Sequence, residues 1–117
     1  MIIWKYNRCG SCRKAIKFLD ENSIEYTPKE ILDDVPTKDD LYKMLGFLNG
    51  ELKKLFNTSG VKYREGNYKD KIKTMTTEEA ITALSKDGAL IKRPFVLAEN
   101  FGTVGFKEDV WKELFNL

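Results

Sequence analysis

Two cysteines, the only ones in 117 residues, form the motif Cys9-Gly10-Ser11-Cys12. The motif directly follows a short apolar strand candidate, Met1–Tyr6, and directly precedes an amphipathic helix candidate, Ser11–Glu21. Two thiols separated by two residues at the start of a helix can close a small disulfide ring, and the leading sulfur faces the unpaired amides and the positive end of the helix dipole. We therefore expect a stabilised thiolate at Cys9.

The composition limits the architecture and the partners. With 42% hydrophobic and 12% aromatic residues, a chain of this length can bury one core, so we expect a single domain over residues 1–117. The 20 basic and 18 acidic residues nearly cancel, which argues against a direct nucleic-acid-binding face. No apolar run approaches the length of a membrane span, and Met1 leads into a strand rather than a signal segment. We expect a cytoplasmic protein, and size and charge favour a monomer.

Several kinds of chemistry lack the residues they need. The chain has no histidine, which removes the triads and dyads in which imidazole carries the proton. Two cysteines cannot complete a tetrahedral zinc site within one chain, so no metal is expected. No glycine-rich nucleotide motif is present, so no organic cofactor is expected. The aromatic residues of the strands and helices, including Tyr6 and Phe106, are assigned to the core.

The next segments predict a β-α-β start followed by a helical middle. The segment Ser23–Ile31 predicts a second strand, because Ile24 and Tyr26 alternate as in a strand until Pro28 interrupts the pattern. Thr37 is suited to cap a helix, and a second helix should begin at Thr76 or Thr77. A short helix is expected between these two, around 52–56.

The end of the chain predicts β-β-α, with strands at 94–98 and 103–106 and a terminal helix whose inner face is Val110, Trp111 and Leu114. The complete order predicts an α/β thioredoxin-like fold with a mixed four-stranded sheet and a helical insertion at about 34–92. In this arrangement Pro94 would face the cysteine loop after a cis Arg93–Pro94 bond. The alternative is an ordinary trans proline at the start of a strand.

Four ordered signatures resemble the arsenate reductase-like (ArsC) family, which includes the bacterial Spx regulators, over nearly the whole chain. They are Tyr6-Asn7-Arg8-Cys9-Gly10-Ser11-Cys12-Arg13-Lys14-Ala15, Lys54-Leu55-Phe56-Asn57-Thr58-Ser59-Gly60, Leu90-Ile91-Lys92-Arg93-Pro94 and Val104-Gly105-Phe106. The resemblance implies a thioredoxin-like domain with a helical insertion, an active cysteine at Cys9 and an arginine, Arg93, beside it.

Arsenate reduction does not carry over directly from this resemblance. The enzymes of that type use a lone cysteine with three arginines, of which only Arg93 has a match here. Asn57 and Phe106 stand where the other two would fall, and neither can supply the charged fork that binds a multiply charged oxyanion. Three other cations are near enough in sequence to compensate: Arg8, Lys92 and Lys107.

Cys12 points to disulfide exchange, since the resemblance places a second cysteine there in Spx-type members but not in the oxyanion enzymes. A Cys9 thiolate would attack an oxidised sulfur, and Cys12 would resolve the mixed disulfide. Glutathione or a thioredoxin-type protein would then restore the dithiol. The leading prediction is a thiol-disulfide oxidoreductase, although sensing would use the same atoms.

The Spx resemblance supplies a second prediction, a redox-sensing transcriptional regulator that binds the α subunit of RNA polymerase. In those regulators a glycine of the middle helical section contributes to docking. Gly50 lies one residue from the corresponding place, and its ordinary role would be to end a helix. The regulators also generally extend further beyond the terminal helix.

The predicted catalytic residues are Cys9, Cys12 and Arg93, and the predicted substrate-binding residues are Asn7, Ser11, Arg93 and Pro94. Asn7 and Ser11 could position a bound anion or the thiolate, and helix capping accounts equally well for Ser11. Arg93 is expected to stabilise the thiolate. Its alternatives are solvation or an ion pair with Glu99 or Asp87.

Overall fold

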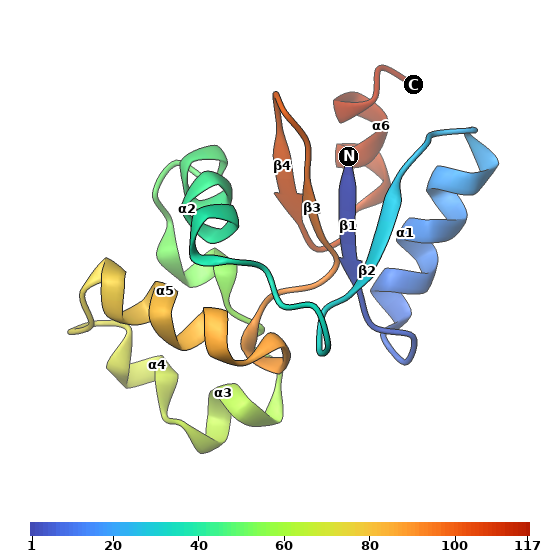
Figure 1. Cartoon of the computed structure of the whole chain (residues 1–117). Helices are drawn as coiled ribbons and strands as arrows, with labels where there is room; N and C mark the ends of the chain where they lie inside the picture. The colour runs from blue at the N-terminus through green and yellow to red at the C-terminus, as the bar shows by residue number, and fades with distance from the viewer.

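A mixed four-stranded sheet forms the centre of the computed structural model, which describes all 117 residues (Figure 1). The strand order is β2-β1-β3-β4, with β1 parallel to β2 and antiparallel pairing from β1 to β3 and from β3 to β4. The strands are β1 (Ile2–Lys5), β2 (Thr27–Glu30), β3 (Phe95–Leu97) and β4 (Gly102–Val104). The predicted mixed sheet and thioredoxin-like fold are confirmed.

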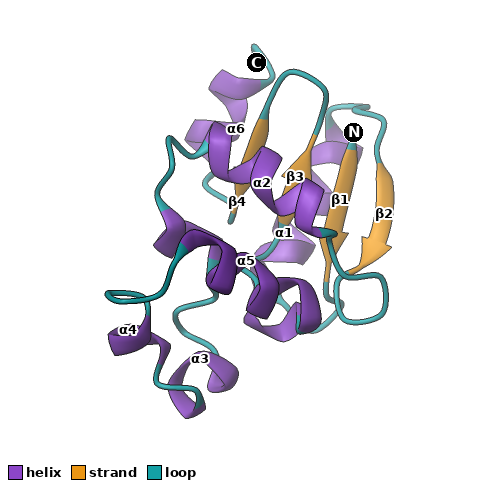
Figure 2. Cartoon of the chain, turned by 60° about the vertical axis from the view of Figure 1, so that its left-hand side comes forward, coloured by secondary structure: helices purple, strands orange, loops and turns teal.

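Helices cover both faces of the sheet (Figures 1 and 2). The two outside the insertion are α1 (Gly10–Glu21) and α6 (Glu108–Leu114). The insertion between β2 and β3 holds α2 (Lys38–Phe47), η1 (Leu52–Leu55), α3 (Val61–Glu65), α4 (Tyr68–Lys71), α5 (Thr77–Lys86) and η2 (Gly88–Leu90), where η denotes a 3-10 helix. None of these helices has the length and apolar character needed to span a bilayer.

The strand alternation divides the core into two clusters. Ile3 and Val96 pack with Phe18 of α1 and Trp111 of α6, whereas Trp4 and its neighbours in β3 belong to the cluster beneath the insertion. Successive side chains of a strand point to opposite faces, so two adjacent strand residues serve the two clusters separately. The sheet thereby ties the insertion to the α1 and α6 layer.

The predicted helix starts are confirmed. Thr37 caps α2 and Thr76 caps α5, and each forms a capping box in which an acidic residue, Asp40 or Glu79, bonds back to the cap amide. The short helix predicted near 52–56 is the 3-10 helix η1. Helices α3 and α4 have no counterpart among the predicted elements, because helices of five and four residues are too short to show a periodic pattern.

Strand β2 lies within the predicted segment Ser23–Ile31, but it occupies the later part of that segment and leaves out Ile24 and Tyr26. The strand begins at Thr27 and includes Pro28, which was expected to interrupt it. The amide nitrogens of Thr27 and Ile31 donate to Met1 and Lys5 of the neighbouring segment, so Pro28 directs its nitrogen away from β1. Because β2 is an edge strand, the missing N–H leaves the ladder intact.

The inner face of α6 was also partly misassigned. Trp111 is buried as predicted and Leu114 is half-buried, but Val110 is 46% exposed. The helix has seven residues, and its inward face is narrow enough that Trp111 dominates the contact with Phe18 and Phe106. Val110 therefore stays accessible at the side of the helix.

A short bridge connects the insertion to the start of β3. Phe56 and Ile91 form an isolated antiparallel bridge, the Asn57 N–H donates to the Leu90 carbonyl at 2.8 Å, and the Lys92 N–H donates to the Leu55 carbonyl at 2.8 Å. Two of the four family-like signatures are thus hydrogen-bonded to each other in space. The bridge fixes the chain immediately before Arg93.

Gly88 permits a close approach between the insertion and the β-α-β half. A Cβ atom at this position would lie 1.9 Å from the carbonyl oxygen of Ile31. A side chain here would therefore force the backbone of η2 away from the end of β2. Gly46, in α2, has no atom within 4 Å of the corresponding Cβ position.

We expect Gly88→Ala to lower the free energy of unfolding by about 1–3 kcal/mol, the usual cost of overpacking a close contact. Gly46→Ala is the matched control, and it should raise the free energy of unfolding by about 0.5–1 kcal/mol because alanine is the better helix former. Urea denaturation followed by circular dichroism measures both changes. Equal stability of Gly88→Ala and the unmodified protein would contradict the close approach.

Candidate active site

Cys9 is the N-cap residue of α1, with φ −90° and ψ 117°, and its sulfur accepts a hydrogen bond from the Cys12 N–H at 3.4 Å. The cap therefore comes from a sulfur rather than from Ser11, and the capping role considered for Ser11 was wrong. An N-cap side chain satisfies an amide that has no partner inside the helix. Here that interaction also places the sulfur at the positive end of the helix dipole.

The pKa values of the two thiols are shifted in opposite directions. Partial burial raises the pKa of Cys9, but hydrogen bonds from the Cys12 thiol and amide and from Arg93, together with the charge of Arg93, outweigh it and lower the pKa overall. Burial is the largest cause that raises the pKa of Cys12 to about 12, and hydrogen bonding and repulsion from Cys9 add to it against a bond with the Tyr6 backbone. Cys9 is thus the thiolate of the pair.

The solvent exposure of the two cysteines agrees with this difference in pKa. Both cysteines carry free thiols, Cys9 is half-buried and Cys12 is only 1% exposed. An external sulfur can reach Cys9 but not Cys12. The second thiol is available only to a group already attached to the first.

Arg93 comes from the segment before β3 and stacks on an aromatic ring of the cysteine loop. Its guanidinium carbon lies 5.0 Å from the centroid of the Tyr6 ring, a distance typical of a cation–π contact. No ion pair joins it to Glu99 or Asp87. Arg93 is therefore held beside Cys9, as predicted from the sequence.

Tyr6 packs against the core cluster beneath the insertion, as predicted, but it is also a residue of the site, which the sequence did not indicate. It is half-buried, and its carbonyl accepts the Cys9 N–H at 3.0 Å while its ring supports Arg93. The available signal was an aromatic residue ending the strand directly before the cysteine loop. Tyr6 positions both the sulfur and the cation.

The Arg93–Pro94 peptide bond is cis, as expected from the fold. Pro94 is buried, and its carbonyl accepts the Gly105 N–H at 2.8 Å. This bond links the segment beside the cysteines to the end of β4. Pro94 is thus placed next to the site, although it presents little surface of its own.

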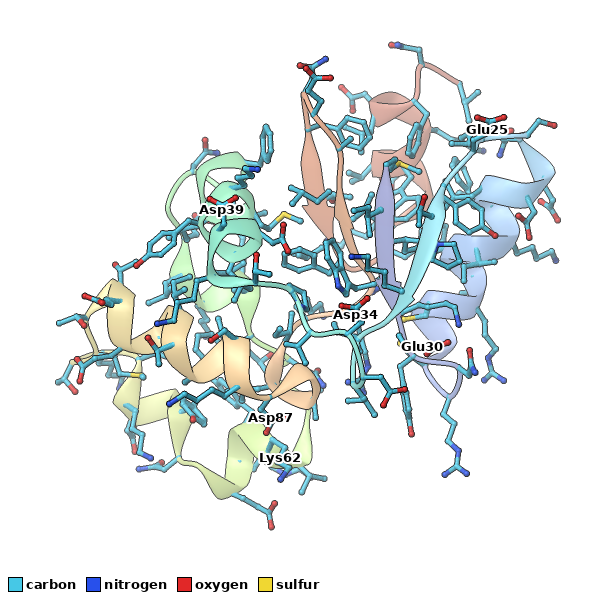
Figure 3. All side chains as sticks on the ribbon, in the orientation of Figure 1. Glu25, Glu30, Asp34, Asp39, Lys62 and Asp87 are labelled. Carbon is cyan, nitrogen blue, oxygen red and sulfur yellow. The ribbon has the colours of Figure 1, made fainter.

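Asn7 and Ser11 are both exposed and occupy opposite ends of the cysteine loop. The side-chain oxygen of Asn7 accepts from the Lys5 ammonium at 2.7 Å, and Lys5 also pairs with Glu30 at the end of β2 (Figure 3). Ser11 lies on the first turn of α1 and lines an adjoining groove. Of these two residues, Ser11 is the one directed toward that groove.

The groove has a volume of about 1020 Å³ and runs between α6 and the insertion. Phe106 lines it, as do Lys92 and Lys107, whereas Arg8 does not. Asn57 is half-buried outside the groove, beside Thr58. The site therefore contains lysines but no second arginine where an oxyanion enzyme would need one.

No three side chains of His, Cys, Asp or Glu come together in a group that could hold a metal ion. The groups at the site are the two sulfurs, the N-terminus of α1 and the Arg93 guanidinium. Such an arrangement can form and break a disulfide.

The sequence profile of the ArsC family matches residues 4–114. This match extends from β1 to the end of α6 and includes both cysteines and Arg93. The chain belongs to the ArsC family. The membership groups it with thiol oxidoreductase-like proteins.

Individual relatives agree with this assignment. The chain is 44% identical over 108 residues to the uncharacterized protein YusI of Bacillus subtilis (strain 168), covering 92% of each chain. It is 26% identical over 109 residues to the global transcriptional regulator Spx 2 of Bacillus anthracis, covering 93% of this chain and 82% of Spx 2. A crystal structure from Bacteroides fragilis, described as ArsC family related, superposes with a TM-score of 0.90 at 45% identity, covering 97% of both chains.

We expect Arg93→Gln to raise the pKa of Cys9 toward the ordinary thiol value, because the substitution removes a hydrogen bond and a positive charge from the thiolate. The rate of iodoacetamide alkylation between pH 5 and 10 reports this pKa, using Cys12→Ser backgrounds so that one thiol reacts. Arg13→Gln is the matched control, since Arg13 is exposed and does not contribute to the shift. An unchanged alkylation profile in Arg93→Gln would contradict the role of Arg93.

Proposed function

We propose that this ArsC family member is a thiol-disulfide oxidoreductase in which Cys9 is the nucleophile and Cys12 is the resolving thiol. The observation that carries the proposal is the arrangement of the two sulfurs at the start of α1. Cys9 caps the helix, is accessible and has a lowered pKa, while Cys12 is buried with a raised pKa. A difference of this kind assigns attack to the first sulfur and resolution to the second.

In the first step the Cys9 thiolate attacks one sulfur of a substrate disulfide. A mixed disulfide forms with Cys9, and the other substrate sulfur leaves as a thiolate that takes a proton from water. Arg93 and the Cys12 amide hold the attacking sulfur at the helix terminus until the new bond forms. The helix terminus thereby stabilises the reduced protein.

In the second step Cys12 gives its proton to water, and the resulting thiolate attacks the sulfur of Cys9. The Cys9–Cys12 disulfide forms as the bond to the substrate breaks, and the second substrate sulfur leaves as a thiolate that takes a proton from water. The negative charge of Cys9 contributes to the raised pKa of Cys12, and this contribution ends once Cys9 is bound in the mixed disulfide. Formation of the mixed disulfide thus lowers the pKa of Cys12 and favours the attack of Cys12 on Cys9.

The oxidised pair returns to the dithiol by two-electron reduction. The reductant in this proposal is a thiol, either glutathione or a thioredoxin-type protein, which becomes oxidised in the exchange. The net reaction transfers two electrons and two protons from that reductant to the substrate disulfide.

A second candidate is a redox-sensing regulator, and the similarity to Spx 2 supports it. In that role the same cysteine pair would switch binding to RNA polymerase through its α subunit. Gly50, considered for docking, has φ +77° and donates its N–H to Leu45 at 2.9 Å in the turn after α2. These features suit a glycine that ends a helix, so they do not add support to the regulator.

We expect Cys12→Ser to accumulate a mixed disulfide with protein or small-molecule disulfides and Cys9→Ser to form none. The reason is that Cys9→Ser removes the nucleophile, whereas Cys12→Ser removes only the resolving step. Mass spectrometry of the intact protein, before and after reduction, measures both. Equal turnover of a disulfide substrate by Cys9→Ser and the unmodified protein would contradict the proposal.

A pull-down from native cell lysate separates the two candidates. Partners captured by Cys12→Ser and released by reductant support the oxidoreductase. RNA polymerase retained by Cys12→Ser and the unmodified protein alike, and insensitive to reductant, would support the regulator instead.

A further inference from the structure

Strand β4 is an edge strand, because only β3 pairs with it. Its first residue is covered by α2, since a Cβ atom on Gly102 would lie 2.9 Å from the sulfur of Met44 and 2.9 Å from the ring of Phe47. The other end of β4 is not covered in this way. Thr103, Val104 and the following Gly105 line the groove beside the cysteine loop.

The register of β4 shows which backbone groups face this groove. Val96 pairs with Thr103, Phe95 pairs with Val104, and the Gly105 N–H donates to the Pro94 carbonyl at 2.8 Å. In an antiparallel ladder alternate residues direct their N–H and C=O groups to the same neighbouring strand. Thr103 and Gly105 therefore face β3, and Val104 directs its backbone donor and acceptor to the free edge.

Two apolar walls rise on either side of this edge. Phe106 and Val110 belong to the α6 side, and Leu48 and Leu52 belong to the segment that follows α2. Figure 1 shows α2, from which that segment continues, and α6 on the two sides of β4. A groove with a strand edge along it and apolar walls fits an extended chain, which would pair with Val104 and place alternate side chains against each wall.

The charge of the groove restricts the sequence of such a chain. Four lysines and one glutamate line it, and the glutamate, Glu51, is paired with Lys54. Lys53, Lys92 and Lys107 have no carboxylate partner. The aliphatic stem of Lys92 lies over the end of β4, where a Cβ atom on Gly105 would be 3.3 Å from its Cε atom. These free cations complement carboxylates.

We propose that the groove docks an extended acidic segment of a client protein as an added strand on β4, which rests on the proposed thiol-disulfide exchange at Cys9. Ser11 lines the groove two residues from Cys9, so a segment bound there brings a neighbouring disulfide to the nucleophile. The groove volume of about 1020 Å³ suits a peptide segment rather than a small oxyanion. The substrate class is thus a protein disulfide flanked by acidic and apolar residues.

The test measures docking separately from redox chemistry. A fluorescein-labelled peptide of about nine residues, with alternating valine and glutamate around a central serine, is titrated with the reduced protein and followed by fluorescence anisotropy. A second peptide carries glutamine in place of glutamate. Two further acidic peptides carry N-methyl groups on alternate amides, one on the odd positions and one on the even positions.

The acidic peptide should bind at least about tenfold more tightly than the glutamine peptide at low salt. The double variant Lys53→Glu and Lys107→Glu should remove this preference. Lys62→Glu with Lys86→Glu is the matched control, because it changes the net charge equally at two exposed lysines outside the groove, and it should retain the preference. Figure 3 shows Lys62 on α3, at the end of the insertion away from α6.

Strand addition predicts that N-methylation of one alternate set of amides abolishes binding and that the other set leaves it largely intact. Equal binding of the acidic and glutamine peptides, or equal binding of both methylated peptides, would overturn the inference. Reduction of bis(2-hydroxyethyl) disulfide, which lacks a peptide, reports the proposed function separately. A protein that reduces this disulfide without preferring the acidic peptide would retain the proposed function and lose only the docking site.

Discussion

The hydrogen bond from the Cys12 N–H to the Cys9 sulfur is the interaction on which the site depends. It makes a cysteine the N-cap of α1, so the start of the helix and the position of the Cys9 sulfur are fixed together. The same contact separates the environments of the two thiols, since one sulfur lies at the helix terminus and the other enters the core. Local folding therefore determines which of the two thiols is accessible and has the lower pKa.

The sequence predicted the elements whose signals are local. The caps at Thr37 and Thr76 and the strand candidates at 1–6 and 94–98 each depend on a few neighbouring residues, and the structure contains all of them. Pro28 was misread because its effect depends on strand order, which no local pattern encodes. A proline on an edge strand costs no ladder hydrogen bond, whereas the same proline inside a sheet would.

The residues of the site could likewise be predicted only where the signal is local in the sequence. Cys9, Cys12 and Arg93 could be identified from the sequence, and the structure brings them together. Tyr6 could not, because an aromatic residue at a strand end has the same pattern whether it fills a core or supports a cation. The groove along β4 was also not predicted, since it is formed by residues from α1, α6, β4 and the insertion. Such a surface exists only after the layers have assembled.

The bridge between Leu55 and Lys92 has a mechanical consequence. The hydrogen bond from the Lys92 N–H to the Leu55 carbonyl is one residue from Arg93 and three residues from Leu52 of the groove wall. The two hydrogen bonds of this bridge join the backbone at the end of η1 to the residues before Arg93 without an intervening loop. The position of the insertion and the position of the Arg93 backbone beside the cysteine loop are therefore coupled through the main chain.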